Sequence, residues 1–218
     1  DAVRTLVDEL DAAWAVAAGG GIPWRKGDGF RNVPANGPAA LLAARTGNVE
    51  RAQATVDWIA DRLANSATGL VYDGLHPDGV LETTTYTYCQ GVVLGANAEL
   101  AARTGEPRHR ARVHCLVDAV AEHLSLTGVL PGTGPGDGGL FAGILARYLA
   151  LVATRFPAET AARELVLTSA DAAWAHRGEV DGLPRFGTDW SQPAGPERDL
   201  SVQVSGWMLL EAAASLER

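Results

Sequence analysis

Apolar residues recur at helical spacing in three segments of the chain, with charged and polar residues between them. In each segment the apolar positions fall three or four residues apart, which places them on one face of an α-helix and leaves the other face to water. The three segments are residues 3–17, 49–63 and 113–124. The pattern therefore predicts three amphipathic helices that each cover one side of a core.

Three other segments are apolar almost all round, at residues 91–100, 140–152 and 202–214. A helix without a polar face packs on both sides and is buried. Because amphipathic and fully apolar segments alternate along the chain, the sequence predicts a double-layered ring of inner buried helices and outer helices that face water. The predicted fold class is all-α, of the α/α-toroid type.

A short repeat marks the turns between these helices. The stretches LLAARTGNVERA (41–52) and ELAARTGEPRHRA (99–111) share Ala-Ala-Arg-Thr-Gly. Gly47 and Gly105 stand where one helix would end and the next would start directly, so we expect both to adopt the left-handed conformation of a helix C-cap. A repeat with a period of about 58 residues indicates stacked helical hairpins.

Four connections are much longer than these turns, at residues 19–34, 66–85, 126–137 and 177–198. In an up-and-down ring all four would emerge on one face, and long loops in a compact domain usually carry function. The first is GGGIPWRKGDGFRNVPANG, in which Trp24 offers a stacking face and Arg25 a planar donor group. A tight turn whose Trp covers the edge of the core would explain the same residues.

Composition narrows the class of ligand. The 218 residues are 47% hydrophobic and 20% charged, with a formal net charge of -8, as in one ordinary globular domain. No run of Lys and Arg is present, so we expect no nucleic acid as a partner. We also expect no membrane span. The sequence does not open on a signal peptide, and its localisation is left open between secreted and cytoplasmic.

The sequence contains two cysteines, Cys89 and Cys115. Folding the chain about Gly105 would place them about 10 Å out of register, too far for a disulfide, so we expect two free, buried thiols. No second Cys or His stands at ligand spacing, so neither a metal nor a cofactor is expected.

Four stretches resemble, in order and spacing, motifs of the bacterial endo-α-1,6-mannanases of glycoside hydrolase family 76. They are GGGIPWRKGDGFRNVPANG, GLVYDGL, TYTYCQGVVLGANAELAARTGE and GGLFAGILARYL. The resemblance runs from about Leu10 to the C-terminus and implies an (α/α)6 toroid with a carbohydrate cleft at the N-termini of the inner helices. About eight helices are visible where the family ring needs twelve. We therefore expect residues 1–218 to be a single domain, a partial ring that is the C-terminal two-thirds of the family domain without its N-terminal helices.

In the family, two consecutive aspartates carry out a retaining hydrolysis of α-mannan, one as nucleophile and one as acid/base. No Asp-Asp occurs in the sequence, and the pair would fall before Asp1. The resemblance thus implies that the catalytic pair lies upstream, and it names no catalytic residue here. It also implies a mannan-like oligo- or polysaccharide as the partner. An open ring exposes inner-helix surface, so we expect the missing N-terminal segment or another chain to cover it.

Eight residues in or beside the long loops are the predicted substrate contacts. They are Trp24, Arg25, Asn36, Asp73, Tyr88, Gln90, Asp137 and Trp190. Several have a structural alternative, which is a turn for Asp73, a helix cap for Asn36 and Asp137, and buried hydrogen bonding for Tyr88 and Gln90. We expect the four other tryptophans, at positions 14, 58, 174 and 207, to lie in the core.

The sequence departs from the family pattern at polar positions of the expected cleft. Cys89 replaces the Asn of Thr-Tyr-Asn-Gln-Gly, and Ala142 replaces the Lys of Phe-Lys-Gly-Ile-Phe. A non-catalytic carbohydrate-binding relative is therefore the alternative to a hydrolase. A sugar epimerase on the same toroid would use cleft histidines, which no inner-helix start offers, and a helical-repeat scaffold would have short, uniform loops.

Overall fold

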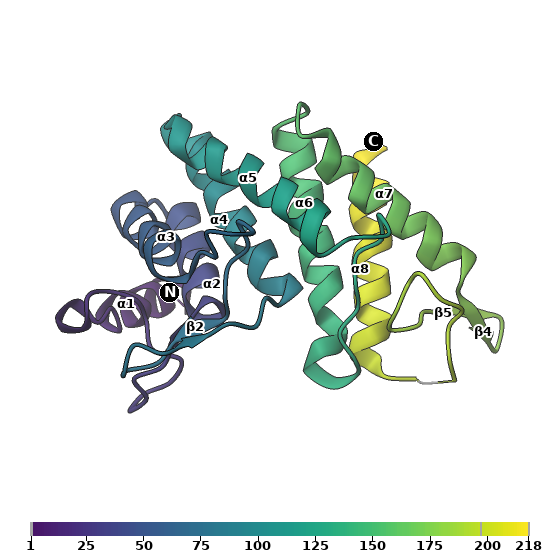
Figure 1. Cartoon of the computed structure of the whole chain (residues 1–218), viewed down its shortest axis with the longest axis horizontal. Helices are drawn as coiled ribbons and strands as arrows, with labels where there is room; N and C mark the ends of the chain where they lie inside the picture. Colours follow the sequence, from purple (N-terminus) through teal and green to yellow (C-terminus); the bar gives the residue numbers. More distant parts are fainter. Residues whose placement is uncertain (1, 197, 218) are drawn as a thin grey trace. The chain divides into compact units, whose positions relative to one another are not determined.

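The computed structural model describes residues 2–196 and 198–217, which form helices joined by short turns and long loops (Figure 1). The chain divides into two compact units, unit 1 (Asp1–Val113) and unit 2 (His114–Arg218). In chain order the helices are α1 (Ala2–Ala12), η1 (Val16–Ala18), α2 (Val33–Thr46), α3 (Val49–Leu63), α4 (Thr87–Thr104), α5 (Pro107–His123), η2 (Gly136–Leu140), α6 (Phe141–Arg155), α7 (Thr160–Ala175) and α8 (Leu200–Leu216), where η denotes a short 3-10 helix.

In unit 1, α2 packs against both α3 and α4. Helix α2 begins where the Asn32 side chain accepts a hydrogen bond from the Ala35 N–H at 3.2 Å, and it ends at Gly47 with φ of 93°. Helix α4 is buried over most of its length and ends at Gly105 with φ of 69°. The structure therefore confirms both predicted left-handed caps and the predicted burial of residues 91–100.

The first helix is shorter than its apolar spacing predicts. The spacing continues to residue 17, but α1 ends at Ala12 and the chain turns, so that the Trp14 ring lies 4.6 Å from the Arg51 guanidinium. Arg51 also donates a hydrogen bond to Asp11 at 2.8 Å, which fastens the end of α1 to the start of α3. No residue of α1 is fully buried. Val7 and Leu10 are half-buried against α2, whereas Val3 and Leu6 are 57% and 49% exposed. The predicted apolar face is therefore only partly covered by the described residues.

In unit 2, α6 and α8 approach each other closely, and α7 packs against both (Figure 1). A β-carbon on Gly143 would lie 2.7 Å from the Ser205 backbone, so the approach depends on the missing side chain. The Gly143 N–H donates a hydrogen bond to Ser205 Oγ at 2.8 Å. By length and composition alone, the 20-residue segment Gly136–Arg155 is apolar enough to cross a membrane, but half of its most apolar window is buried inside the fold, as in a core helix.

Short antiparallel strands form inside the long connections, a detail that the all-α prediction does not include. The strands are β1 (Arg31–Asn32), β2 (Gly74–Leu75) and β3 (Leu81–Glu82), in one sheet of order β1-β2-β3, and the hairpin of β4 (Gly178–Val180) and β5 (Leu183–Arg185). Asp-Gly pairs lie between the strands of both hairpins, and Gly79 and Gly182 have positive φ values of 86° and 77°. Such pairs are strong hairpin signals.

Three predicted burials are wrong. Both cysteines are free, as predicted, but Cys115 is exposed on α5 while Cys89 is buried in α4. Trp174 and Trp207 are 46% and 71% exposed, although both were expected in the core. Helical spacing gives the direction of a side chain around its helix, and it does not reveal whether another element lies opposite.

Candidate functional site

Two of the predicted functional loops, residues 19–34 and 66–85, are joined in unit 1, where the structure has them as residues 19–32 and 64–86. In the sheet, Arg31 pairs with Leu75 and Gly74 pairs with Glu82. This pairing brings the first loop beside the second, and the second loop in turn contacts the first turns of α4 through hydrogen bonds described below. The loops thus gather at the start of a buried helix.

Gly20 and Gly21 allow the first loop to pass directly over two tryptophan rings. Their φ values are 97° and 85°, in the left-handed region. A β-carbon would lie 2.9 Å from the Trp14 ring at the first position and 2.8 Å from the Trp58 ring at the second. Gly20 and Gly21 of the first motif are therefore required for close packing of the loop.

Asn36 anchors the same loop from the interior. Its Oδ1 accepts a hydrogen bond from the Ile22 N–H at 2.7 Å, and its Nδ2 donates to the carbonyls of Ile22 at 2.9 Å and Asn32 at 2.8 Å. The side chain is fully buried. The N-cap of α2 is Asn32, not Asn36. The Asn36 amide is bonded to backbone groups of the loop and helix, so its role in this structure is structural and not the predicted ligand contact.

Gln90 anchors the second loop in the same manner. Its Oε1 accepts from the Val71 N–H at 2.8 Å, and its Nε2 donates to the carbonyls of Val71 at 2.9 Å and Tyr86 at 3.0 Å. Gln90 is also fully buried. Of the two interpretations open for this residue, the geometry supports buried hydrogen bonding.

Asp73 and Tyr88 lie together where these loops meet α4. The Asp73 side chain is close to Cys89, whose Sγ lies 3.8 Å from Oδ1, and Tyr88 precedes that cysteine in the first turn of the helix. Burial raises the pKa of the Asp73 carboxyl, and the negative charge of Glu82 raises it further. Burial likewise raises the pKa of the Tyr88 hydroxyl, which therefore stays protonated as a donor.

Trp24 and Arg25 lie on a hairpin tip that projects from the first loop. Trp24 is 52% exposed, and the Trp24 N–H donates to the Phe30 carbonyl at 2.8 Å across the hairpin. The Phe30 ring stacks on His76 of the second loop with centroids 4.6 Å apart, which ties the two tips together. Asp28 accepts a hydrogen bond from Arg25 at 3.1 Å, so part of the predicted donor group is already paired.

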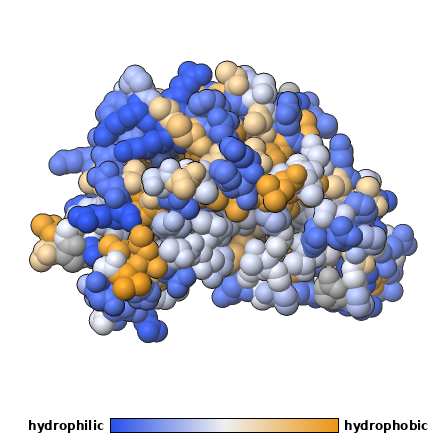
Figure 2. Space-filling model, viewed as in Figure 1, coloured by the Kyte–Doolittle hydropathy of each residue, from blue (hydrophilic) through white to orange (hydrophobic). Residues whose placement is uncertain are grey.

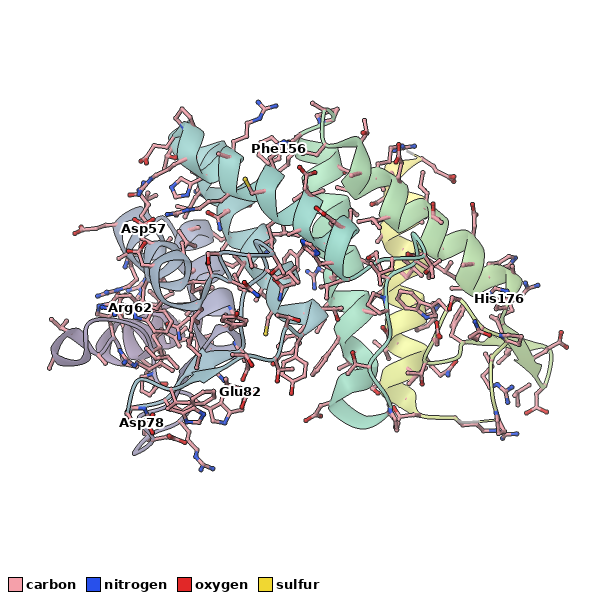
Figure 3. All side chains as sticks on the ribbon, in the orientation of Figure 1. Asp57, Arg62, Asp78, Glu82, Phe156 and His176 are labelled. Carbon is pink, nitrogen blue, oxygen red and sulfur yellow. The ribbon has the colours of Figure 1, made fainter. Side chains whose placement is uncertain are left out.

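The second loop also contributes residues that the sequence did not indicate. Figure 3 labels Asp78 and Glu82 at this edge of unit 1, and Figure 2 shows hydrophobic residues grouped on the same part of the surface. The Thr87 hydroxyl is buried without a hydrogen-bond partner among the described residues, and no side chain caps the start of α4. The Asp78-Gly79 turn could have revealed the hairpin that places Glu82 beside Asp73.

The two remaining predicted contacts belong to unit 2. Asp137 is exposed in the first turn of η2, where the loop is held by a hydrogen bond of 3.2 Å from the Gly136 N–H to Asp199. Trp190 is only 2% exposed, and its carbonyl accepts a hydrogen bond from His176 at 2.9 Å. The Trp190 ring therefore belongs to the core of unit 2, which corrects the prediction that it offers a stacking face.

The aromatic and polar groups of the two joined loops of unit 1 and of the start of α4 suit a neutral, hydroxyl-rich ligand. Trp24 offers a flat apolar face, while Asp73, Glu82 and Tyr88 offer acceptors and donors within one region. In residues 2–196 and 198–217, no group of three or more His, Cys, Asp or Glu side chains is placed to hold a metal ion.

Comparisons with known proteins agree on one family. The family model described as glycosyl hydrolase family 76 matches residues 1–216. The α-1,6-mannanase GH76A from Salegentibacter sp. HEL1_6 is 31% identical with a TM-score of 0.89, over 98% of this chain and 68% of that chain. An inactive variant of that mannanase, with two adjacent aspartates replaced, was solved with α-1,6-mannotetrose and matches equally well. These likenesses confirm the predicted α/α-toroid fold class.

A fungal relative extends the comparison. A mannan endo-1,6-α-mannosidase from Candida glabrata is 29% identical over 204 residues, which covers 79% of this chain and 45% of the relative. The chain thus spans less than half the length of this relative, and about two-thirds of the length of the Salegentibacter mannanase.

Proposed function

Because the chain belongs to glycosyl hydrolase family 76, we propose that it acts on α-mannan as part of an endo-α-1,6-mannanase. The observation that carries this proposal is the likeness to the Salegentibacter α-1,6-mannanase over 98% of the chain. The exposed Trp24 ring on the first loop, together with the polar side chains of Asp73 and Tyr88 where the second loop meets α4, is consistent with a sugar ligand.

We further propose a retaining mechanism whose two carboxyl groups come from outside residues 1–218. Retention needs two carboxyls about 5 Å apart, one as nucleophile and one as acid/base. No Asp-Asp pair occurs in the sequence, and about a third of the Salegentibacter mannanase has no counterpart in it. In this proposal the groups of unit 1 hold the sugar while the upstream aspartates perform the chemistry.

The same proposal accounts for exposed apolar surface on two helices. Leu6 of α1 is 49% exposed, and Trp207 of α8 is 71% exposed. Large apolar groups on a helix face are usually covered by another element. We propose that residues 1–218 belong to one toroid domain and that an upstream segment or another chain covers these faces.

A non-catalytic carbohydrate-binding protein is the second candidate. It is favoured by Cys89 and Ala142, which remove an amide and an ammonium group from the family pattern. The two candidates differ in cleavage: both bind mannan, and only the first hydrolyses it to shorter products.

Binding of α-1,6-mannotetraose, followed by tryptophan fluorescence, tests the proposed sugar-binding surface. We expect Trp24→Ala to weaken binding at least tenfold, because it removes the stacking face. Trp174→Ala is the matched control, since Trp174 is similarly exposed, at 46%, on the outer helix α7 and stacks on Arg177. Equal effects of the two substitutions, or none, would count against this surface as the ligand site.

A further inference from the structure

The backbone of Asp73 is fixed by hydrogen bonds from two sides. The Asp73 N–H donates to the Thr84 carbonyl at 2.8 Å, and its carbonyl accepts from the Val33 N–H at 2.8 Å. The next residue, Gly74, has no room for a side chain, because a β-carbon there would lie 2.7 Å from Asn32 and Phe30. The residue itself is only 9% exposed.

The carboxyl, in contrast, is held weakly. Among the described residues, the one side chain that donates a hydrogen bond to it is Cys89, at 3.8 Å, and a thiol is a weak donor. A buried carboxylate usually accepts stronger hydrogen bonds from N–H or O–H groups. The charged groups that face Asp73 are Glu82 of β3, which repels it, and His76 after β2, which attracts it.

Cys89 also connects Asp73 to the second predicted contact. Tyr88 directly precedes Cys89 in the first turn of α4, and burial together with the charge of Asp73 raises the pKa of both the Tyr88 hydroxyl and the Cys89 thiol, so the three residues lie together at the start of this helix. Cys89 itself is fully buried and cannot touch a ligand. Any effect of Cys89 on a ligand must therefore pass through its two neighbours.

The residue at position 89 is where this chain departs from the family pattern, which has an asparagine. An amide donates a much stronger hydrogen bond to a carboxylate than a thiol does. We propose that Cys89 is a positioning residue that leaves the Asp73 carboxyl free to accept hydrogen bonds from sugar hydroxyls. An asparagine at position 89 would donate its amide N–H to this carboxyl and compete with those hydroxyls. The sugar in this inference rests on the proposed function, whereas the control of Asp73 by Cys89 does not.

The test compares four variants of the protein with its natural upstream sequence. Cys89→Ser and Cys89→Asn supply stronger donors, Cys89→Ala removes the donor, and Cys115→Ser is the control because Cys115 is exposed on α5. The ionisation of Asp73 is followed by carbon-13 NMR of labelled aspartate, with Asp73→Asn to assign the signal. Affinity for α-1,6-mannotriose is measured on the same samples across pH.

We expect the midpoint of the Asp73 titration to fall by about half a pH unit or more in Cys89→Ser and Cys89→Asn and to rise in Cys89→Ala. Cys115→Ser should leave it unchanged. At neutral pH, Cys89→Asn should bind mannotriose about 3- to 10-fold more weakly, because its amide competes for the carboxyl. As pH is lowered, the affinity for mannotriose should fall with the same midpoint as the Asp73 titration in each variant. A simple loss of packing would not produce this match.

Two outcomes would overturn the inference. One is an Asp73 titration that is the same in the wild type and in all folded Cys89 variants. The other is a shifted titration with unchanged affinity for mannotriose. Should Cys89→Asn fail to fold, the inference is still tested by the opposite shifts in the Asp73 titration expected for Cys89→Ser and Cys89→Ala. If the titration shifts as expected but the wild type itself does not bind mannotriose, the control by Cys89 stands and the proposed function fails.

Discussion

Replacing Asn36 by alanine should release the first loop of unit 1. One amide makes three hydrogen bonds to the loop and helix backbone, at 2.7, 2.9 and 2.8 Å. At about 1 kcal/mol each, these bonds contribute about 3 kcal/mol. Counting instead the cost of leaving the Ile22 N–H buried without a partner gives about 1–3 kcal/mol. Because both counts describe the same loss, we expect the free energy of unfolding to fall by about 3 kcal/mol.

Urea unfolding followed by circular dichroism measures this loss. The midpoint should fall at an unchanged m-value, since the surface exposed on unfolding does not change. Asn65→Ala is the matched control, because it removes one exposed hydrogen bond, to the Ala67 N–H at 2.9 Å, and should cost less than about 1 kcal/mol. A loss for Asn36→Ala that is no larger than the loss for Asn65→Ala would refute the assignment of Asn36 as the anchor.

Three further predictions concern titration and close packing. Burial lowers the pKa of His109 below its unfolded value, so the free energy of unfolding should fall as pH drops through about 6.5. His109→Gln should reduce this pH dependence, as measured by urea unfolding at several pH values. The hydrogen bond that His114 donates to the Glu159 carboxylate raises the pKa of His114, so its contribution to stability should be complete below the unfolded pKa and lost as pH rises through the folded value. His114→Gln should remove that opposite slope. Gly143→Ala should cost about 1–3 kcal/mol by forcing α6 away from α8, and a thermal midpoint equal to that of the wild type would contradict the close contact.

The helices and tight turns could be predicted because their signals are local. The repeated Thr-Gly pairs mark the ends of α2 and α4, where Gly47 and Gly105 adopt the predicted left-handed conformation, and the apolar spacing of residues 49–63 coincides with α3. The end of α1 could not be predicted in this way. Its apolar spacing continues past Ala12, and the turn there depends on the contact of Trp14 with Arg51, which is distant in sequence.

The candidate site could be predicted only in part, because residue type does not reveal burial. Trp24 and Trp190 occupy similar positions in long loops, yet one is 52% exposed and the other 2%. Asn36 and Gln90 suit a sugar by chemistry, but their amides are used by backbone groups of the loops. Glu82 became part of the site only through the pairing of β2 with β3.

The most direct test of the central proposal is the anomeric proton NMR spectrum of α-1,6-mannotetraose during incubation with residues 1–218 and, separately, with the protein that includes its natural upstream sequence. We expect cleavage only by the longer protein, with the α-anomer as the first product, since retention preserves the configuration of the bond. Cleavage by residues 1–218 alone would contradict the proposed upstream position of the catalytic pair. Absence of cleavage by the longer protein would contradict the mannanase proposal itself.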